Sequence, residues 1–236
     1  MAEDAPAPTM QDSPIEATRR GGIASERRYL KLLAIAAVAI ILAHLFDSFA
    51  FRYVRWEDVY GEDWARMLRV MGFFPLWLCA AIALGLHDRT PWRKVVRARA
   101  GLLVLGAGLG GVAAELLKLV IRRGRPGDLG EYVFRSFADR PFSTASFGMP
   151  SSHALVAFGA AAVLSRMFPR AWPIWWGLAW GCGITRVGAG AHFLSDVVVA
   201  AVVGWAVGAV VWSWRERPAP VPVDVPDAQA VAEVGA

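Results

Sequence analysis

Three short stretches of the sequence carry polar residues that suit the binding of an anion. KLVIRRGRP contains Lys118 and Arg125, PSSH spans residues 150–153, and ITRVGAG contains Arg186. The planar fork of donors on arginine matches two phosphate oxygens at once, and lysine adds a compact positive charge. A proline before a serine suits a helix start, where free amide groups and the Ser151 hydroxyl face an anion. These stretches predict a phosphate site.

Two histidines and one aspartate supply groups that could do chemistry on such a phosphate. His192 and Asp196 are four residues apart, so on a helix they share a face. Asp196 can then accept the proton on His192 Nδ1 and leave Nε2 as a nucleophile toward phosphorus. His153 is the available acid for the leaving oxygen and afterwards the base for the attacking water. This arrangement predicts hydrolysis through a phosphohistidine intermediate.

The elements that must position these residues are long and apolar. Hydrophobic residues make up 56% of the 236 residues, which is well above the share in a soluble domain. Six apolar segments follow one another, and several match the roughly 20 residues that span a bilayer. We therefore expect an all-α polytopic membrane protein with six transmembrane helices, at residues 29–46, 70–86, 100–121, 152–168, 171–187 and 192–214.

The charges in the loops predict how these helices are oriented. If every segment spans, the termini and the loops after the second and fourth segments fall on one face, which the positive-inside rule makes cytoplasmic. The polar residues of the three stretches then gather on the opposite face. The cytoplasmic cations are Arg19, Arg20, Arg27, Arg28, Arg89, Arg93, Lys94, Arg97, Arg99, Arg166, Arg170, Arg215 and Arg217.

The composition of both ends differs from that of the middle. Residues 1–28 are rich in proline, alanine and charge, which predicts a disordered tail. Proline is too dense in residues 215–236 for a helix or a central strand, so we expect a second tail there. One membrane domain is left at residues 29–214. The first apolar run begins only after the polar N-terminal tail and lacks a convincing small-residue cleavage site, which favours a retained membrane anchor over a removed signal peptide.

The loop at residues 122–151 is basic on the face where the charge rule does not expect it. An anionic headgroup would account for these cations, and a solvated loop accounts for most of them nearly as well. They are Arg122, Arg123, Arg125, Arg135 and Arg140.

The third apolar segment contains an acidic residue and a pair of glycines. Glu115 lies one turn before Lys118, where it could pair with a basic group at the site or make a structural hydrogen bond. Gly106 and Gly110 form a small-x-x-x-small pair, which predicts close packing between helices.

Taken together, the three stretches resemble the three motifs of the type 2 phosphatidic acid phosphatase (PAP2) superfamily, in its bacterial membrane lipid phosphatase branch. Lys118 to Pro126 matches K-x6-R-P, PSSH resembles P-S-G-H, and TRVGAGAHFLSD resembles S-R-x5-H-x3-D. Ser152 and Thr185 stand where the family usually has Gly and Ser. The order of the motifs and their places at the segment ends also match.

The resemblance implies a PAP2-type helical core and a role for each polar residue. His192 would be the nucleophile, Asp196 its partner and His153 the general acid. The phosphate would be held by Lys118, Arg125, Ser151, Arg186 and the backbone N–H of Ser152.

These features favour a membrane lipid-phosphate phosphatase over two other classes of protein. A vanadate-dependent haloperoxidase would use the same cradle, but the haloperoxidases of the family are soluble. A transporter or channel would place its charges nearer to the midplane of the bilayer. The expected location is the inner membrane of a bacterium, with the site facing the periplasm.

Several lipids fit the expected chemistry, and the sequence does not choose among them. Prenyl diphosphate, phosphatidylglycerol phosphate, phosphatidate and the phosphates of lipid A are all candidates. We expect no metal, no cofactor, no nucleic-acid partner and no obligate protein partner.

Overall fold

The computed structural model describes residues 14–89, 91, 94 and 98–215. These residues form helices and contain no strand, apart from isolated bridges of Arg123 with Phe134 and of Gly124 with Phe147. The predicted all-α class is therefore confirmed for the described part of the chain. The elements are α1 (Pro14–Tyr53), η1 (Val59–Gly61), α2 (Asp63–Val70), α3 (Phe74–His87), α4 (Arg99–Ile121), α5 (Ser152–Met167), η3 (Pro169–Ala171), α6 (Trp172–Gly188) and α7 (Leu194–Arg215).

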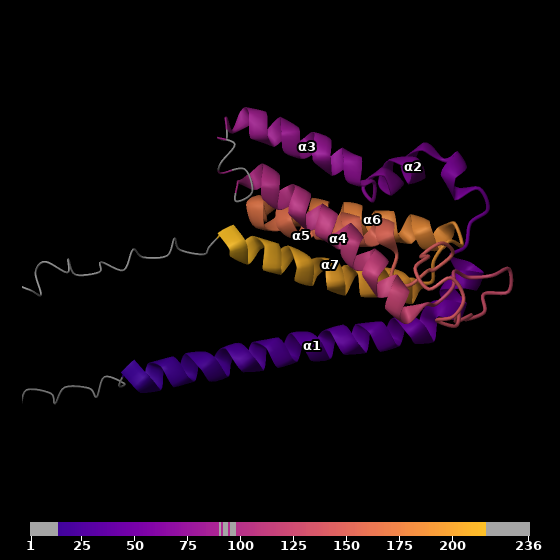
Figure 1. Ribbon diagram of the computed structural model, residues 1–236, viewed down its shortest axis with the longest axis horizontal. Coiled ribbons are helices and arrows are strands. Elements are labelled where there is room, and N and C mark those ends of the chain that lie inside the picture. Colours follow the sequence, from indigo (N-terminus) through magenta and orange to yellow (C-terminus); the bar gives the residue numbers. More distant parts are fainter. Residues whose placement is uncertain (1–13, 90, 92–93, 95–97, 216–236) are drawn as a thin grey trace, which may run out of the picture.

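Helix α5 lies at the centre of the bundle and packs against α4, α6 and α7 (Figure 1). Every residue from Ala154 to Leu164 is buried. Alanine and glycine dominate this stretch, and small residues let helix backbones approach closely. A Cβ added at Gly106 would lie 2.8 Å from the carbonyl oxygen of Gly159, and one added at Gly110 would lie 2.7 Å from that of Leu155. The predicted packing role of this glycine pair is confirmed.

Helix α1 stands apart from the bundle over most of its length and joins it at its C-terminal end (Figure 1). Only 6% of its apolar window is buried, compared with 39% in α4 and 50% in α7. Large apolar side chains such as Leu33 and Leu45 are exposed. The last turns are different, because Asp47 and Ala50 are buried where the helix meets α7. An apolar surface of this extent suits contact with lipid.

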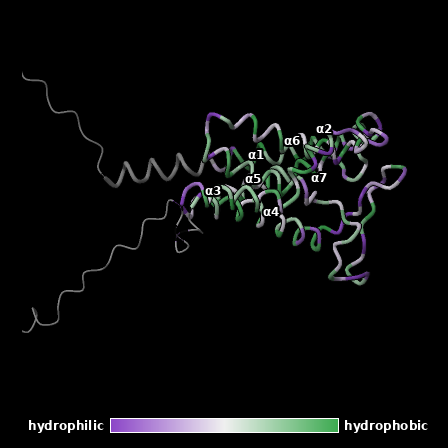
Figure 2. The backbone as a smooth tube through the Cα atoms, turned by 90° about the horizontal axis from the view of Figure 1, so that it is seen from above, coloured by the Kyte–Doolittle hydropathy of each residue, from purple (hydrophilic) through white to green (hydrophobic). Residues whose placement is uncertain are grey.

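Within the described residues, three helices are long and apolar enough to cross a membrane, namely α1 from Tyr29, α4 and α7. Helices α2 and α3 meet at a bend of 66° and form a fourth candidate span. Helix α5 is apolar but has only 16 residues, or about 24 Å against a hydrocarbon core of about 30 Å. Figure 2 shows that hydrophobic residues follow the helices and that hydrophilic ones gather in the loops.

The observed helices differ from the predicted segments at both ends of α1 and at the start of α7. Helix α1 begins at Pro14, inside the predicted tail, and continues to Tyr53. It can pass the end of its apolar run because the carboxylate of Asp47 finds partners near α7. Residues 47–69, which lie between the first two predicted segments, therefore contain helix, and α7 begins only at Leu194. Residues 1–13, Arg93, Arg97 and 216–236 lie outside the described residues.

Gly159→Ala is expected to destabilise the bundle, because its Cβ would collide with the carbonyl oxygen of Gly106. Such overpacking costs about 1–3 kcal/mol of unfolding free energy. Gly177→Ala in α6 is the matched control, since nothing in the described chain lies within 4 Å of an added Cβ there. Thermal unfolding in detergent compares the two variants with the parent. Equal melting temperatures for both variants would contradict a tight α4–α5 contact.

Candidate active site

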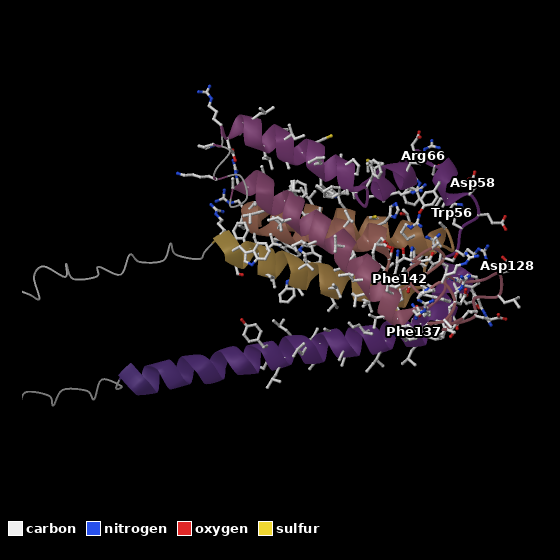
Figure 3. The ribbon with its side chains drawn as sticks, in the orientation of Figure 1. Trp56, Asp58, Arg66, Asp128, Phe137 and Phe142 are labelled. Carbon is white, nitrogen blue, oxygen red and sulfur yellow. The ribbon has the colours of Figure 1, made fainter. Side chains whose placement is uncertain are left out.

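The predicted site residues come together at one end of the bundle, where α4 and α6 end and α5 and α7 begin (Figure 1). Lys118 lies in the last turn of α4, and Arg186 lies in the last turn of α6. Ser151 is the N-cap of α5, and His192 lies in the turn before α7. Figure 3 shows polar and aromatic side chains at the same end, among them Trp56, Asp58 and Asp128 of the loops and Arg66 of α2.

The ring of His192 is buried, with 3% of the residue exposed, and one of its nitrogens is fixed. Nδ1 lies 2.9 Å from the carbonyl oxygen of Gly148 and 3.4 Å from Oδ2 of Asp196. Both oxygens can only accept, so Nδ1 carries the proton and Nε2 of the neutral ring keeps a free lone pair. The predicted acceptor, Asp196, therefore shares its role with a backbone carbonyl that lies closer.

The surroundings of His192 also set its protonation state. Burial lowers the pKa of His192, and the hydrogen bond to Asp196 opposes this effect. The positive charges of Arg186 and Arg125 lower the pKa further. The net direction is downward from an ordinary value of about 6.5, so the imidazole is neutral at pH 7. A nitrogen nucleophile needs this neutral state.

Asp196 is completely buried and binds more groups than His192 alone. Its Oδ1 accepts a hydrogen bond from the guanidinium of Arg123, and its Oδ2 accepts one from the backbone N–H of Phe193 at 2.8 Å. Its backbone carbonyl oxygen accepts the N–H of Ser151 at 3.2 Å. Asp196 is thereby fixed, and it ties the start of α7 to the start of α5.

Among the eight predicted site residues, two buried donors have no hydrogen-bond partner within the described part of the chain. They are the hydroxyl of Ser151 and Nε of Arg186. An unpaired buried donor costs about 1–3 kcal/mol, so both indicate a place where an anion binds. The guanidinium of Arg186 is held by Tyr60, because NH1 donates to the Tyr60 hydroxyl at 2.8 Å.

Lys118 is held beside the first turn of α5 by two neighbours. Its Nζ donates to Oε1 of Glu115 at 2.8 Å and also to the hydroxyl of Ser152. The Ser152 hydroxyl donates to the same Glu115 oxygen at 2.6 Å. Glu115 thus pairs with a basic group at the site, which is one of the two roles predicted for it. The side chain of Ser152, at the position where the family usually has Gly, helps to hold Lys118.

His153 and Arg125 lie at the edges of the site. His153 is partly buried in the first turn of α5, within electrostatic range of His192, Arg186 and Lys118. The backbone of Gly72 packs against it, since an added Cβ would lie 2.6 Å from that of His153. Arg125 is exposed, and its charge acts on His192. The structure therefore brings all eight predicted residues to the same region.

Two residues of the site were absent from the prediction, namely Arg123 and Asp47. Arg123 is 1% exposed and binds Asp196. Asp47 of α1 is equally buried and lies 3.8 Å from the Arg123 guanidinium. A carboxylate at the end of an otherwise apolar segment is the signal that could have identified Asp47. Arg123 lies inside the first motif stretch, but its type and position do not distinguish it from Arg122.

The side chain of Arg122 is buried within the loop at residues 122–151, where it binds the backbone of that loop. It is 1% exposed and lies 5.2 Å from the Phe137 ring and 4.9 Å from the Phe147 ring. Neither a bound headgroup nor a solvated loop therefore accounts for Arg122 or Arg123, and both expectations are wrong for them. The guanidinium of Arg122 donates to the carbonyl oxygens of Arg135, Ser136, Asp139 and Pro141.

Comparison with known proteins gives similar sequences and a similar fold. A protein from Rhizobium johnstonii named Lipid A 1-phosphatase is 38% identical over 96 residues, which are 40% of this chain and 38% of that protein. A second protein of the same name, from Rhizobium etli, is 34% identical over 144 residues, which are 55% of this chain and 61% of that protein. The chain thus spans less than two thirds of the length of either relative.

A solved structure has a similar arrangement of helices. It is described as the first transmembrane PAP2 type phosphatidylglycerolphosphate phosphatase from Bacillus subtilis, and it is 20% identical to this chain. The match has a TM-score of 0.59 and covers 81% of this chain and 97% of that one. The shared architecture, together with the apolar helices, supports a membrane protein.

The family model of the PAP2 superfamily matches residues 99–219, which is more than half of the chain. This span contains all three motif stretches, from Lys118 to Asp196, and the helices that position them. The chain therefore belongs to the PAP2 superfamily.

Proposed function

We propose that this protein is an integral-membrane phosphatase that hydrolyses a phosphomonoester or diphosphate of a membrane lipid through a phosphohistidine intermediate. The observation that carries the proposal is the buried ring of His192. Its Nδ1 is bound by the Gly148 carbonyl oxygen at 2.9 Å, which leaves Nε2 as the nucleophile. The unpartnered donors of Ser151 and Arg186, within the described residues, offer a place for the phosphate beside it.

In the first step, Nε2 of His192 attacks phosphorus in line with the leaving oxygen. The equatorial oxygens gain negative charge, which Lys118, Arg125 and Arg186 neutralise. The amide groups of the first turn of α5 have no partner within the helix and add the positive end of its dipole. Charge compensation by three cationic side chains needs no metal ion.

Proton transfer by His153 accompanies both bond-breaking steps. In the first, protonated His153 donates its proton to the leaving oxygen, which departs as an alcohol or a phosphate. In the second, neutral His153 accepts a proton from water as the water oxygen attacks the phosphohistidine. The bond between nitrogen and phosphorus breaks, inorganic phosphate leaves, and His192 returns to its neutral form.

We propose six membrane crossings, formed by α1, the bent pair α2–α3, α4, α5, α6 and α7. Helix α1 begins and α7 ends at the end of the bundle away from the site (Figure 1), which supports cytoplasmic termini and a periplasmic site. Helix α3 ends and α4 begins at that same far end (Figure 1). The described basic residues Arg89, Lys94 and Arg99 therefore lie there, as the positive-inside rule expects of the cytoplasmic face. The lipid tail of the substrate would then stay in the bilayer while its phosphate enters at the interface.

The names of the two Rhizobium relatives favour a phosphate of lipid A as the first substrate to test. Prenyl diphosphate, phosphatidylglycerol phosphate and phosphatidate complete the panel. Phosphate release from each lipid in detergent, without added divalent metal, identifies the preferred one. Absence of release from all four would refute the proposed function.

His192→Ala is expected to reduce phosphate release to the uncatalysed background, because it removes the nucleophile. In a serine protease the loss of the nucleophile costs about 2 × 10⁶-fold in kcat. Vanadate, which mimics the transferring phosphoryl group, is expected to inhibit the parent enzyme. His87→Ala, at the far end of α3, is the control and should retain full activity. Retained turnover in His192→Ala would exclude the phosphohistidine route.

His153→Ala is expected to slow the release of a poor leaving group such as a lipid alcohol by about 10²–10⁴-fold. A good leaving group such as p-nitrophenolate needs little protonation, so its release should slow much less. Initial rates on an alkyl and a p-nitrophenyl phosphate give the comparison. If both substrates lost the same factor, His153 would not be the general acid.

Cysteine labelling is expected to place the two ends of the bundle on opposite sides of the membrane. In a Cys79→Ser background, Cys182 is buried and unreactive. A membrane-impermeant maleimide should label Asp128→Cys in intact spheroplasts, because that residue lies at the end of the bundle that holds the site (Figure 3). Arg89→Cys, in the α3–α4 loop, should be labelled only after permeabilisation. Labelling of both positions from the same side would contradict the six crossings.

A further inference from the structure

A buried network of charged and polar groups joins α1 to the start of α7. Arg123 NH2 donates to the hydroxyl of Ser195 at 2.7 Å and to Oδ1 of Asp196. Asp47 Oδ1 accepts the backbone N–H of Ser195 at 2.7 Å, and Asp47 Oδ2 accepts its hydroxyl. All four residues are at most 1% exposed. Helix α1, which lies outside the motif region, is therefore linked through Asp47 and the Ser195–Arg123 pair to the carboxylate of Asp196.

Aromatic rings close this network off from water. The Arg123 guanidinium carbon lies 5.0 Å from the ring centres of both Tyr132 and Phe193. The Tyr132 hydroxyl donates to Asp47 Oδ2 at 2.6 Å. Burial, reinforced by this hydrogen bond, raises the pKa of Tyr132, so the phenol stays a neutral donor. Charges in such a buried environment of low dielectric constant act more strongly on one another than they would in water.

The network carries one net negative charge, which can stabilise a cationic ring of His192. Arg123 orients Asp196, but one guanidinium beside one carboxylate would cancel the negative charge that a cationic imidazole ring needs. Asp47 supplies a second carboxylate, 3.8 Å from the Arg123 NH1. Two carboxylates and one guanidinium leave one net negative charge. When Nε2 bonds to phosphorus, the imidazole ring becomes positive, and this excess stabilises it.

We propose that Arg123 and Asp47 are positioning residues for the His192–Asp196 pair, with Arg123 fixing the carboxylate and Asp47 keeping the network negative. The inference rests on the proposed function, because it assigns these residues to the same phosphoryl transfer. It extends the active site to α1, which lies outside the residues 99–219 that match the family model. A network that only held the fold together would change stability and leave the titration of His192 unaltered.

Other charged groups that face His192 are the same in every variant of the test. Asp196 of α7, Arg186 of α6 and Arg125 of the preceding loop act on it directly. His153 of α5 lies within electrostatic range. The acidic limb of kcat/KM reports the pKa of the group that must be unprotonated in the free enzyme, which in this mechanism is His192.

Asp47→Asn keeps the size of the side chain and an acceptor for the Ser195 N–H, but removes one negative charge. We expect kcat to fall by about 10–100-fold, as for the outer partners of metal-bound histidines, with little change in KM. The acidic limb should move to lower pH, because the imidazolium loses a stabilising charge. Arg123→Met removes the positive charge and should lower kcat similarly, but it should move the limb to higher pH.

Arg123→Lys separates charge from geometry, because lysine keeps the charge and loses the fork that binds both Ser195 and Asp196. It should lower kcat without moving the acidic limb. If Arg123→Met does not fold, Asp47→Asn and Arg123→Lys decide the question. Asp88→Asn is the matched control, since its carboxylate binds Arg99 at the far end of α4, and its kinetics should equal those of the parent.

An unmoved acidic limb in Asp47→Asn, or shifts of the same sign in Asp47→Asn and Arg123→Met, would overturn the inference. Thermal unfolding of each variant shows whether the loss of kcat follows loss of folded protein. Phosphate release by the parent enzyme in the same assay distinguishes failure of the proposed function from failure of the positioning roles. If the parent released no phosphate from any lipid, the proposed function would fail, whereas an active parent with unmoved limbs rejects the positioning roles alone.

Discussion

Burial of the Asp196 carboxylate is the constraint on which the rest of this structure depends. A carboxylate removed from water at the start of an apolar helix is costly unless hydrogen bonds and opposite charge compensate it. The guanidinium of Arg123 and the N–H of Phe193 provide that compensation. Satisfying Asp196 therefore fixes the start of the 122–151 loop and the turn before α7. The orientation of His192 follows, because its Nδ1 lies between Asp196 and the carbonyl oxygen of Gly148.

The alanine- and glycine-rich α5 provides the scaffold that lets the cations converge. Since α4, α6 and α7 all pack on it, their ends at the site lie close together. Lys118, Arg186 and the first turn of α5 then surround one position. The proposed phosphate site is thus supported by helix ends held in a dense core, whereas Arg125 comes from the loop and is exposed. Rigid support of this kind keeps donors aimed at a transition state without reorganisation.

Much of the fold and the site was accessible from the sequence, because the information is local. Apolar runs predict helices through their length and composition, and α3 to α7 lie close to the predicted segments. Their ends were less accurate. Helix α1 runs through Asp47 because that carboxylate is satisfied by Ser195, a residue far away in the chain. The number of membrane crossings is also not fixed by apolarity alone, since α5 is shorter than a full span.

The sequence by itself determined which chemical groups are present and their order: the cations, the two histidines, and the four-residue spacing of His192 and Asp196. Only the tertiary structure decided which neighbour each group binds. In the folded chain the carbonyl of Gly148 is the closest acceptor of His192, Arg123 binds Asp196, and Arg122 is buried between aromatic rings. The physical reason is that every residue has a carbonyl and adjacent arginines have identical charge. Their partners depend on how a loop folds, which no spacing or periodicity records.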